Sequence, residues 1–274
     1  MTMDVGSLIR EAAATLRAAG VDAPEFDAKA LLAHACGCEV RDVDKAMLLG
    51  RGVESVLTEQ QDDAARLPAL FHRDVARRVK REPLQHITGH APFRYLDLQV
   101  GPGVFIPRPE TETVVQDGFD WLAAQALSSP RIVDLCAGSG AIGLAAVTEI
   151  ASAEVWAVEL NAATLEWTTR NCKQVADNDS SVGGRYHLVQ GDATDPDTLR
   201  ELDGTVDLVI SNPPYIPLSE IPEQPEVRDH DPEQALYGGS ADGLLIPERI
   251  IDRSFALLRD GGCLIMEHDI SQGQ

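Results

Sequence analysis

Residues 131–143 read RIVDLCAGSGAIG, an apolar run of strand length followed by a turn with three glycines. Glycines at a strand-to-helix turn let a ligand approach the backbone closely, and the N-terminus of the next helix can host polar or anionic groups. Further short apolar runs, separated by helical segments, occur at 155–158, 186–189, 206–210 and 263–266. This alternation predicts an α/β fold in which helices cover both faces of a parallel sheet.

Acidic residues stand where two of the predicted strands end. Glu159 lies about twenty residues beyond the glycines, where a carboxylate can accept hydrogen bonds from both ribose hydroxyls of a nucleoside. Asp192 follows the third strand and can accept from an adenine amine. Because the carboxyl ends of parallel strands meet in one crevice, a nucleoside ligand is predicted there. Residues 138–143 also have the GxGxxG spacing of dinucleotide-binding proteins, so the glycines alone leave NAD open.

The fourth predicted strand ends in Asn212-Pro213-Pro214-Tyr215. The side-chain oxygen of Asn212 and the carbonyl of Pro213 can together accept both hydrogens of a planar NH2 group, and Tyr215 offers a flat face beside it. The prolines leave Asn212 and Pro213 little rotational freedom. A bare Asn-Pro pair commonly just closes a strand with a turn, but the whole element after a buried strand favours a socket for an amide or an aromatic amine. Hydride transfer has no evident use for such a socket, which favours a methyl donor over NAD.

Three parts are expected along the chain. Residues 1–82 have a helical pattern and form a small N-terminal domain, with helices up to Gly20 and over 27–35, 42–48 and 58–81, the last with a capping box of Thr58 and Gln61. In residues 83–109, apolar pairs on either side of 101–103 (Gly-Pro-Gly) predict a linking β-hairpin. Residues 110–274 form the catalytic domain, and its first helix opens at Pro109.

Composition narrows the class of partner. The net charge is −21, and most of the acidic excess falls in residues 91–274, which disfavours direct binding to phosphate backbones. The basic residues between 73 and 81 form either a solvated helix face or a docking patch. No apolar run reaches the length of a membrane span and no signal sequence is seen, so a cytoplasmic protein without membrane contact is expected. The five scattered cysteines and seven histidines lack ligand spacing, so no metal is predicted.

Several longer motifs resemble known enzymes. VDLCAGSGAIGLA, AVELN, GDAT and VISNPPYI resemble class I S-adenosylmethionine-dependent methyltransferases, which have a Rossmann-like sheet. Three stretches narrow the resemblance to the PrmC/HemK family of protein-glutamine methyltransferases: PLQHITG at 83–89, GVFIPRPETE at 103–112, and QALYGG at 234–239 with DGL at 242–244. The resemblance covers nearly the whole chain.

This resemblance implies an activity and a set of site residues. The implied reaction is methylation of the side-chain amide nitrogen of the glutamine in the Gly-Gly-Gln motif of class 1 peptide-chain release factors, with S-adenosylmethionine as donor, S-adenosylhomocysteine as product and the helical domain recognising the substrate. The cofactor site would comprise Cys136, Ala137, Gly138, Ser139, Gly140, Glu159, Asp192, Ala193 and Asn212. The substrate would contact Phe105, Arg108 and the catalytic residues Asn212, Pro213, Pro214 and Tyr215. Two positions depart from the family pattern: Glu159 replaces the commoner Asp, and Cys136-Ala137 replaces a Gly-Thr pair.

Other functions stay open at this point. An exocyclic amine of a nucleic-acid base also fits the socket, as does the glutamine of a ribosomal protein, and a cofactor-binding regulatory protein without turnover is a third reading. Class I methyltransferase sheets usually have seven strands, the last two forming an antiparallel hairpin after the strand that here is 263–266. That C-terminal strand hairpin is expected to be missing, since only eight residues follow, and the uncovered sheet edge favours self-association.

Overall fold

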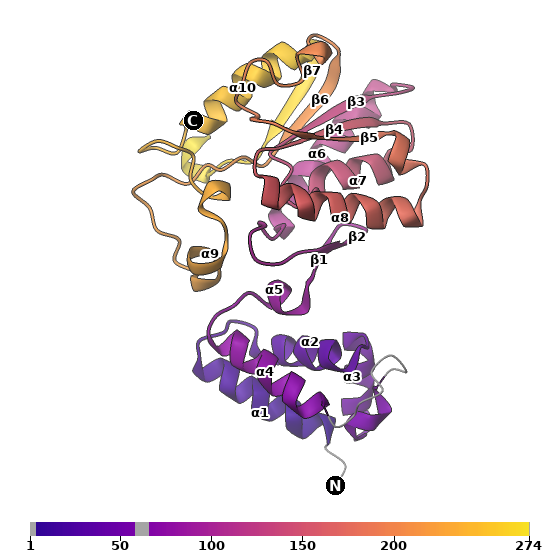
Figure 1. Ribbon diagram of the computed structural model, residues 1–274, viewed down its shortest axis with the longest axis vertical. Coiled ribbons are helices and arrows are strands. Elements are labelled where there is room, and N and C mark those ends of the chain that lie inside the picture. The colour runs from indigo at the N-terminus through magenta and orange to yellow at the C-terminus, as the bar shows by residue number, and fades with distance from the viewer. Residues whose placement is uncertain (1–3, 58–65, 274) are drawn as a thin grey trace. The chain divides into compact units, whose positions relative to one another are not determined.

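The computed structural model describes residues 4–57 and 66–273 and divides into two compact units, Met1–Gly89 and His90–Gln274 (Figure 1). The division falls inside residues 83–109, which we expected to link a helical part to a catalytic part. The capping box expected at Thr58 and Gln61 lies outside the described residues. Each unit has its own hydrophobic core.

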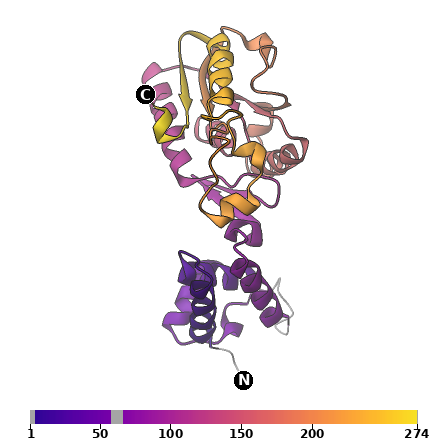
Figure 2. The ribbon, with the colours of Figure 1, turned by 90° about the vertical axis from the view of Figure 1, so that its left-hand side faces the viewer.

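The described residues of the first unit form helices and connecting turns, as the sequence pattern predicts (indigo to purple in Figures 1 and 2). Its elements are α1 (Val5–Ala18), α2 (Pro24–Cys36), α3 (Val40–Leu48), the 3-10 turn η1 (Val53–Ser55), α4 (Leu67–Val79) and α5 (Leu84–Thr88). Asp4 caps α1 by accepting a hydrogen bond from the backbone N–H of Ser7, and Gly37 ends α2 in the left-handed conformation. The buried faces meet in a core that includes Leu16, Leu31 and Phe71.

The basic residues between 73 and 81 do not form one surface: Arg73 and Lys80 are exposed, whereas Arg78 is buried. The Arg78 guanidinium is buried and lies 2.7 Å from the carboxylate of Asp27 in α2. Arg77 pairs with Glu82 at 2.5 Å. Because Arg78 is buried and ion-paired with Asp27, it does not belong to a solvated or docking face.

The second unit opens with a hairpin whose position differs from the prediction. Strands β1 (His90–Phe93) and β2 (Leu96–Gln99) pair antiparallel, so the turn lies at Arg94-Tyr95 and the expected turn at 101–103 is wrong. Arg94 has φ +52°, a left-handed conformation that sequence rules assign to glycine or asparagine. Its guanidinium is fixed by Glu149, at 2.6 Å, which supports this conformation from outside the hairpin. The Pro/Gly segment has another purpose, since a Cβ on Gly101 would lie 2.7 Å from the Trp167 ring.

A five-stranded parallel sheet follows in the order β5-β4-β3-β6-β7. The strands are β3 (Arg131–Leu135), β4 (Glu154–Glu159), β5 (Tyr186–Gln190), β6 (Val206–Ser211) and β7 (Leu258–Met266). The first four lie within a residue of their predicted bounds, whereas β7 begins five residues before the predicted 263–266. The helices are α6 (Pro109–Gln125), α7 (Ala141–Glu149), α8 (Ala162–Asn178), α9 (Pro225–His230) and α10 (Leu245–Leu257). Short 3-10 turns are η2 (Val182–Gly184), η3 (Arg200–Leu202), η4 (Glu233–Ala235) and η5 (Ile270–Gln272).

Helices cover both faces of this sheet, as predicted for an α/β fold (Figure 1). Neighbouring residues of one strand point to opposite layers: Ile132 packs with α6, α7 and α8, whereas Val133 packs with the layer that contains α10. Strand β7 is at the edge, drawn in yellow in Figure 2, and within 4–57 and 66–273 no strand pairs with its outer side. Self-association through that edge stays a prediction.

Candidate active site

A pocket lies at the carboxyl ends of the four strands β3, β4, β5 and β6, where the sequence placed the crevice. The chain runs from β3 to β4 on one side and returns to β6 on the other, so the pocket sits where the strand order reverses. The space between its lining residues, counted together with the open solvent at its mouth, is about 1080 Å³.

The glycine-containing loop after β3 forms the floor of the pocket, and hydrogen bonds to side chains of β3 and α8 fix its shape. Asp134 is fully buried in β3 and accepts a hydrogen bond of 2.8 Å from the backbone N–H of Gly143 in α7. Thr168 of α8 donates to the Gly138 carbonyl at 2.7 Å. Gly140 caps α7 at φ +85°, and a Cβ there would lie 2.8 Å from the Thr168 methyl. Cys136 has φ +71°, so this thiol occupies a backbone conformation that favours glycine.

Glu159 ends β4 and binds the backbone on both sides of the pocket floor. Its Oε2 accepts from the N–H of Gly138 at 2.9 Å, and its Oε1 accepts from the N–H of Asn161 at 2.8 Å. Burial raises the pKa of Glu159, while these backbone donors oppose that rise. Each oxygen keeps a second lone pair, so the carboxylate can hold the loop and still accept from a ribose hydroxyl.

The Asn-Pro-Pro-Tyr element follows β6 directly, and Asn212 and Pro214 line the pocket. The side-chain Nδ2 of Asn212 donates to the Thr111 hydroxyl at 3.2 Å. Within 4–57 and 66–273, no hydrogen bond is donated to Asn212 Oδ1 or to the Pro213 carbonyl. Asn212 lines the pocket, whereas Pro213 is buried beside it and does not line the pocket.

The far side of this element is supported by the segment after α9. The backbone N–H groups of Tyr215 and Ile216 donate to the carbonyl of Leu236 at 3.1 and 2.8 Å. Glycine is required here by close approach: a Cβ on Gly243 would lie 2.1 Å from the Tyr215 carbonyl, and one on Gly238 would lie 1.8 Å from that of Gly243. Backbone contact thus fixes the position of the element.

Phe105 and Arg108 were both expected to contact the substrate, but they differ in whether they line the pocket. Phe105 lines the pocket, whereas Arg108 does not. The guanidinium of Arg108 lies 4.8 Å from the centroid of the Phe105 ring and binds the buried carboxylate of Asp231 at 2.5 Å. Burial raises the pKa of Asp231 to about 6, although the charge of Arg108 opposes this rise. Arg108 therefore contacts Phe105 and Asp231 without lining this pocket, and its contact with a substrate stays a prediction.

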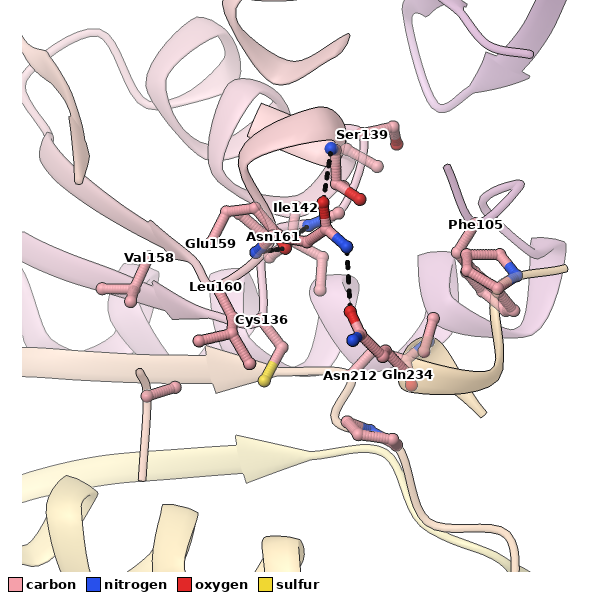
Figure 3. A pocket seen from close by; sticks show the side chains of 18 of the residues that line it. Phe105, Cys136, Ser139, Ile142, Val158, Glu159, Leu160, Asn161, Asn212 and Gln234 are labelled. Atoms are coloured by element: carbon pink, nitrogen blue, oxygen red, sulfur yellow. Dashed lines mark hydrogen bonds between the residues drawn. The ribbon is translucent and has the colours of Figure 1, made fainter. Parts of the chain in front are cut away.

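The structure brings together most of the predicted site residues. Those that line the pocket are Phe105, Cys136, Ala137, Gly138, Ser139, Glu159, Asp192, Ala193, Asn212 and Pro214. Gly140, Pro213 and Tyr215 lie next to lining residues without lining it themselves. Sequence reasoning missed Thr111, Asn161 and Gln234, which also line it. Asn161 has the signal of a helix cap before α8, and its Nδ2 donates to Gln234 Oε1 at 2.8 Å across the pocket (Figure 3).

None of the helices in the described residues has both the length and the apolar character to cross a membrane. No group of three His, Cys, Asp or Glu side chains in 4–57 and 66–273 is arranged to hold a metal ion.

Known proteins match this sequence over nearly its whole length. The chain is 59% identical to a release factor glutamine methyltransferase of Bifidobacterium longum, over 99% of this chain and 89% of that protein. The chain belongs to the release factor glutamine methyltransferase family. Residues 7–89 match the family described as PrmC N-terminal domain, and residues 85–225 match the one described as Conserved hypothetical protein 95.

Two other relatives show how wide this methyltransferase family is. A release factor glutamine methyltransferase of Streptomyces coelicolor is 46% identical over 97% of this chain and 85% of that protein. A 4-amino-L-phenylalanine/4-methylamino-L-phenylalanine methyltransferase of Streptomyces pristinaespiralis is 37% identical over 94% of this chain and 80% of that protein. Both the glutamine amide of the first name and the aromatic amine of the second carry an NH2 group, the group for which the sequence predicts a socket.

Proposed function

We propose that this protein transfers a methyl group from S-adenosylmethionine to the side-chain amide nitrogen of the glutamine in the Gly-Gly-Gln motif of class 1 release factors. The observation that carries the proposal is the pair of free acceptors after β6. Asn212 Oδ1 and the Pro213 carbonyl are rigidly held next to the pocket, and no described residue donates to either. They match the two N–H groups of a primary amide.

The pocket residues fit the donor. When bound, S-adenosylmethionine supplies a methyl group on a positively charged sulfur, which becomes neutral when the methyl leaves. Glu159 accepts from the ribose hydroxyls, Asp192 borders the adenine, and the backbone of 136–139 borders the amino-acid end. The carboxylates of Glu159 and Asp192 both line the pocket, which agrees with a ligand rich in N–H and O–H donors.

The acceptor side works by orientation. An amide nitrogen is a poor nucleophile because its lone pair is delocalised into the carbonyl. When Asn212 and Pro213 accept both N–H groups, the nitrogen is held with one face toward the donor, and a fixed geometry lowers the barrier. No strong base is needed, because the proton can leave to water after the methyl has been transferred. Tyr215 and Phe105 provide flat walls for the glutamine side chain.

The alternatives differ in the acceptor. A nucleic-acid base would bring phosphates toward a part of the chain that carries most of the net charge of −21. The aromatic amine named for the Streptomyces pristinaespiralis relative is a second NH2 acceptor, and it serves as a specificity control. Glutamine in a ribosomal protein is a third. The helical unit, which matches the PrmC N-terminal domain, is the part that we assign to recognition of the protein substrate.

The experiment is a competition among acceptors. The protein is incubated with labelled donor and an intact class 1 release factor, a Gly-Gly-Gln peptide, ribosomal proteins, RNA or 4-amino-L-phenylalanine, and the products are analysed by mass spectrometry. We expect methylation at the glutamine of the release factor, and weaker methylation of the short peptide, which lacks contacts with the helical unit. Methylation of RNA or of the free amino acid in preference to the release factor would refute the proposal.

Replacing Asn212 by Ala tests the role of the acceptor pair. The change removes one preorganised hydrogen-bonding group and should lower kcat by about 100-fold or more. The affinity for S-adenosylhomocysteine, measured by calorimetry, should change much less. Turnover close to that of the unchanged protein would contradict the assignment of Asn212.

A further inference from the structure

A chain of hydrogen bonds connects Asn212 to a carboxylate outside the pocket. The Thr111 hydroxyl, in the first turn of α6, accepts from Asn212 Nδ2 at 3.2 Å and donates to Glu267 Oε2 at 2.6 Å. Glu267 follows β7 directly, and its own N–H donates to the Ser211 carbonyl at 3.0 Å, next to Asn212. Thr111 is buried, and Glu267 does not line the pocket.

The chemistry of the three groups gives this chain a direction. An ionised carboxylate can only accept hydrogen bonds, so Thr111 must use its single hydrogen toward Glu267. The hydroxyl then has only lone pairs left for Asn212, and the amide must turn its Nδ2 toward Thr111. As a result, Asn212 Oδ1 points away from Thr111 and stays free. Bonds in such a chain also polarise one another, and the negative charge at its end strengthens the free oxygen as an acceptor.

The other carboxylate oxygen holds the far end of the Asn-Pro-Pro-Tyr element. The Tyr215 hydroxyl donates to Glu267 Oε1 at 3.2 Å. Burial and the nearby Glu267 charge raise the pKa of Tyr215 to about 12, so the phenol keeps the proton that it donates. Glu267 thus contacts the element at both ends, through Thr111 on one side and Tyr215 on the other.

We propose that Glu267 is a positioning residue for methyl transfer, which acts through Thr111 to fix the amide of Asn212 with its oxygen toward the acceptor NH2. The inverted amide would present its own NH2 to the NH2 of the substrate and would repel it. The proposal rests on the proposed function in one respect: the acceptor group is an NH2. It adds to that function the two residues that orient the Asn212 amide, Thr111 in α6 and Glu267 directly after β7, which lie outside the Asn-Pro-Pro-Tyr element.

Four variants test the chain. Glu267→Gln keeps the shape but can donate as well as accept, so both orientations of the Asn212 amide become compatible with Thr111. It should lower kcat about 10-fold, the usual effect of losing a hydrogen bond to a charged group. Thr111→Val should lower kcat to a similar degree, and Thr111→Ser, which keeps the hydroxyl, should recover most of the loss. Glu248→Gln, an exposed carboxylate in α10, is the matched control and should leave kcat unchanged.

Two readouts separate positioning from a general structural effect. KM for S-adenosylmethionine should stay within about 2-fold in Glu267→Gln, since Glu267 does not line the pocket. In the Asn212→Ala background, Glu267→Gln should cause almost no further loss of kcat, because the group through which it acts is gone. Equal losses in both backgrounds, or a kcat for Glu267→Gln within about 2-fold of the unchanged protein, would overturn the proposal.

A spectroscopic test does not depend on the identity of the acceptor. In protein labelled with ¹⁵N-asparagine, with Asn212 assigned from the Asn212→Asp variant, the side-chain NH2 hydrogens should show a nuclear Overhauser effect to the Thr111 methyl. This effect should weaken in Glu267→Gln. If it is absent from the unchanged protein, the orientation is wrong; if it is present but no Gly-Gly-Gln substrate is methylated, the proposed function fails and the positioning of Asn212 stands.

Discussion

Replacing Asp134 by Asn should change how the stability of the protein depends on pH. Asp134 is fully buried in β3, and its Oδ2 accepts from the backbone N–H of Gly143. No described residue donates to its Oδ1. Burial raises the pKa of Asp134 from 3.8 to about 7, and the backbone hydrogen bond only partly offsets this. The ionised carboxylate is therefore more costly in the folded protein than in the unfolded chain.

The sign and size of the effect follow from linkage. Between pH 3.8 and about 7 the folded state binds more protons at Asp134 than the unfolded state, so stability falls as the pH rises through this window. Each unit of pKa difference corresponds to about 1.4 kcal/mol, which gives a total of about 4 kcal/mol above pH 7. About a third of this is already lost at pH 5, and the rest, on the order of 2–3 kcal/mol, is lost between pH 5 and pH 8. An asparagine does not titrate and avoids this loss.

The assay is urea unfolding at pH 5 and pH 8, followed by tryptophan fluorescence. Trp121, Trp156 and Trp167 all lie in the unit 90–274, so the signal reports the unfolding of the unit that contains Asp134. The free energy of unfolding of Asp134→Asn, relative to the unchanged protein, should rise by about 2–3 kcal/mol from pH 5 to pH 8. Asp229→Asn is the control: Asp229 is exposed and Arg228 lowers its pKa, so its difference should not rise with pH. A difference for Asp134→Asn that is the same at both pH values would refute the reasoning.

Two further substitutions probe the pocket floor. Cys136→Gly should stabilise the protein by up to about 1 kcal/mol in urea unfolding, because relief of the left-handed conformation outweighs the extra freedom of glycine in the unfolded chain. Cys136→Ala keeps the strained conformation and should not stabilise the protein. A loss of stability in Cys136→Gly would count against strain at this position. Glu159→Gln should weaken binding of S-adenosylhomocysteine about 10- to 100-fold in calorimetry. The reason is that the new NH2 group must face one of two backbone N–H donors, that of Gly138 or that of Asn161. Unchanged affinity would show that the carboxylate is not needed.

The sheet and the crevice could be predicted because their signals are local. Apolar runs of strand length predicted the place of all five strands, and the polar residues Glu159, Asp192 and Asn212 after three of these runs marked the crevice, since parallel strands end at one edge. The glycines of 138–143 gave the pocket floor. Asn212 could be picked out because its neighbours are prolines, whose effect on the backbone does not depend on the rest of the fold.

What the sequence could not predict depends on contacts between distant residues. Arg94 takes a glycine-like conformation because Glu149, fifty-five positions away, fixes its side chain, so the hairpin turn had no local signal. Arg78, one of the basic residues between 73 and 81, is buried against Asp27, which lies fifty-one positions away in the sequence. Thr111 lies between Glu110 and Glu112 at the start of a helix, and its partner Glu267 is 156 positions away in the sequence, so no local signal indicates their hydrogen bond.

The place of β7 at the edge of the sheet has a consequence for activity at raised temperature. An edge strand opens locally at a lower free energy than the central strands, and it does so without disturbing the core. Because Glu267 follows β7, each opening would break the hydrogen bond between Thr111 and the Glu267 carboxylate. The molecule would then be inactive while the strand is open, although the rest of it stays folded. Activity should then fade at temperatures below the unfolding transition, at a rate that follows hydrogen exchange in β7 and not in β6.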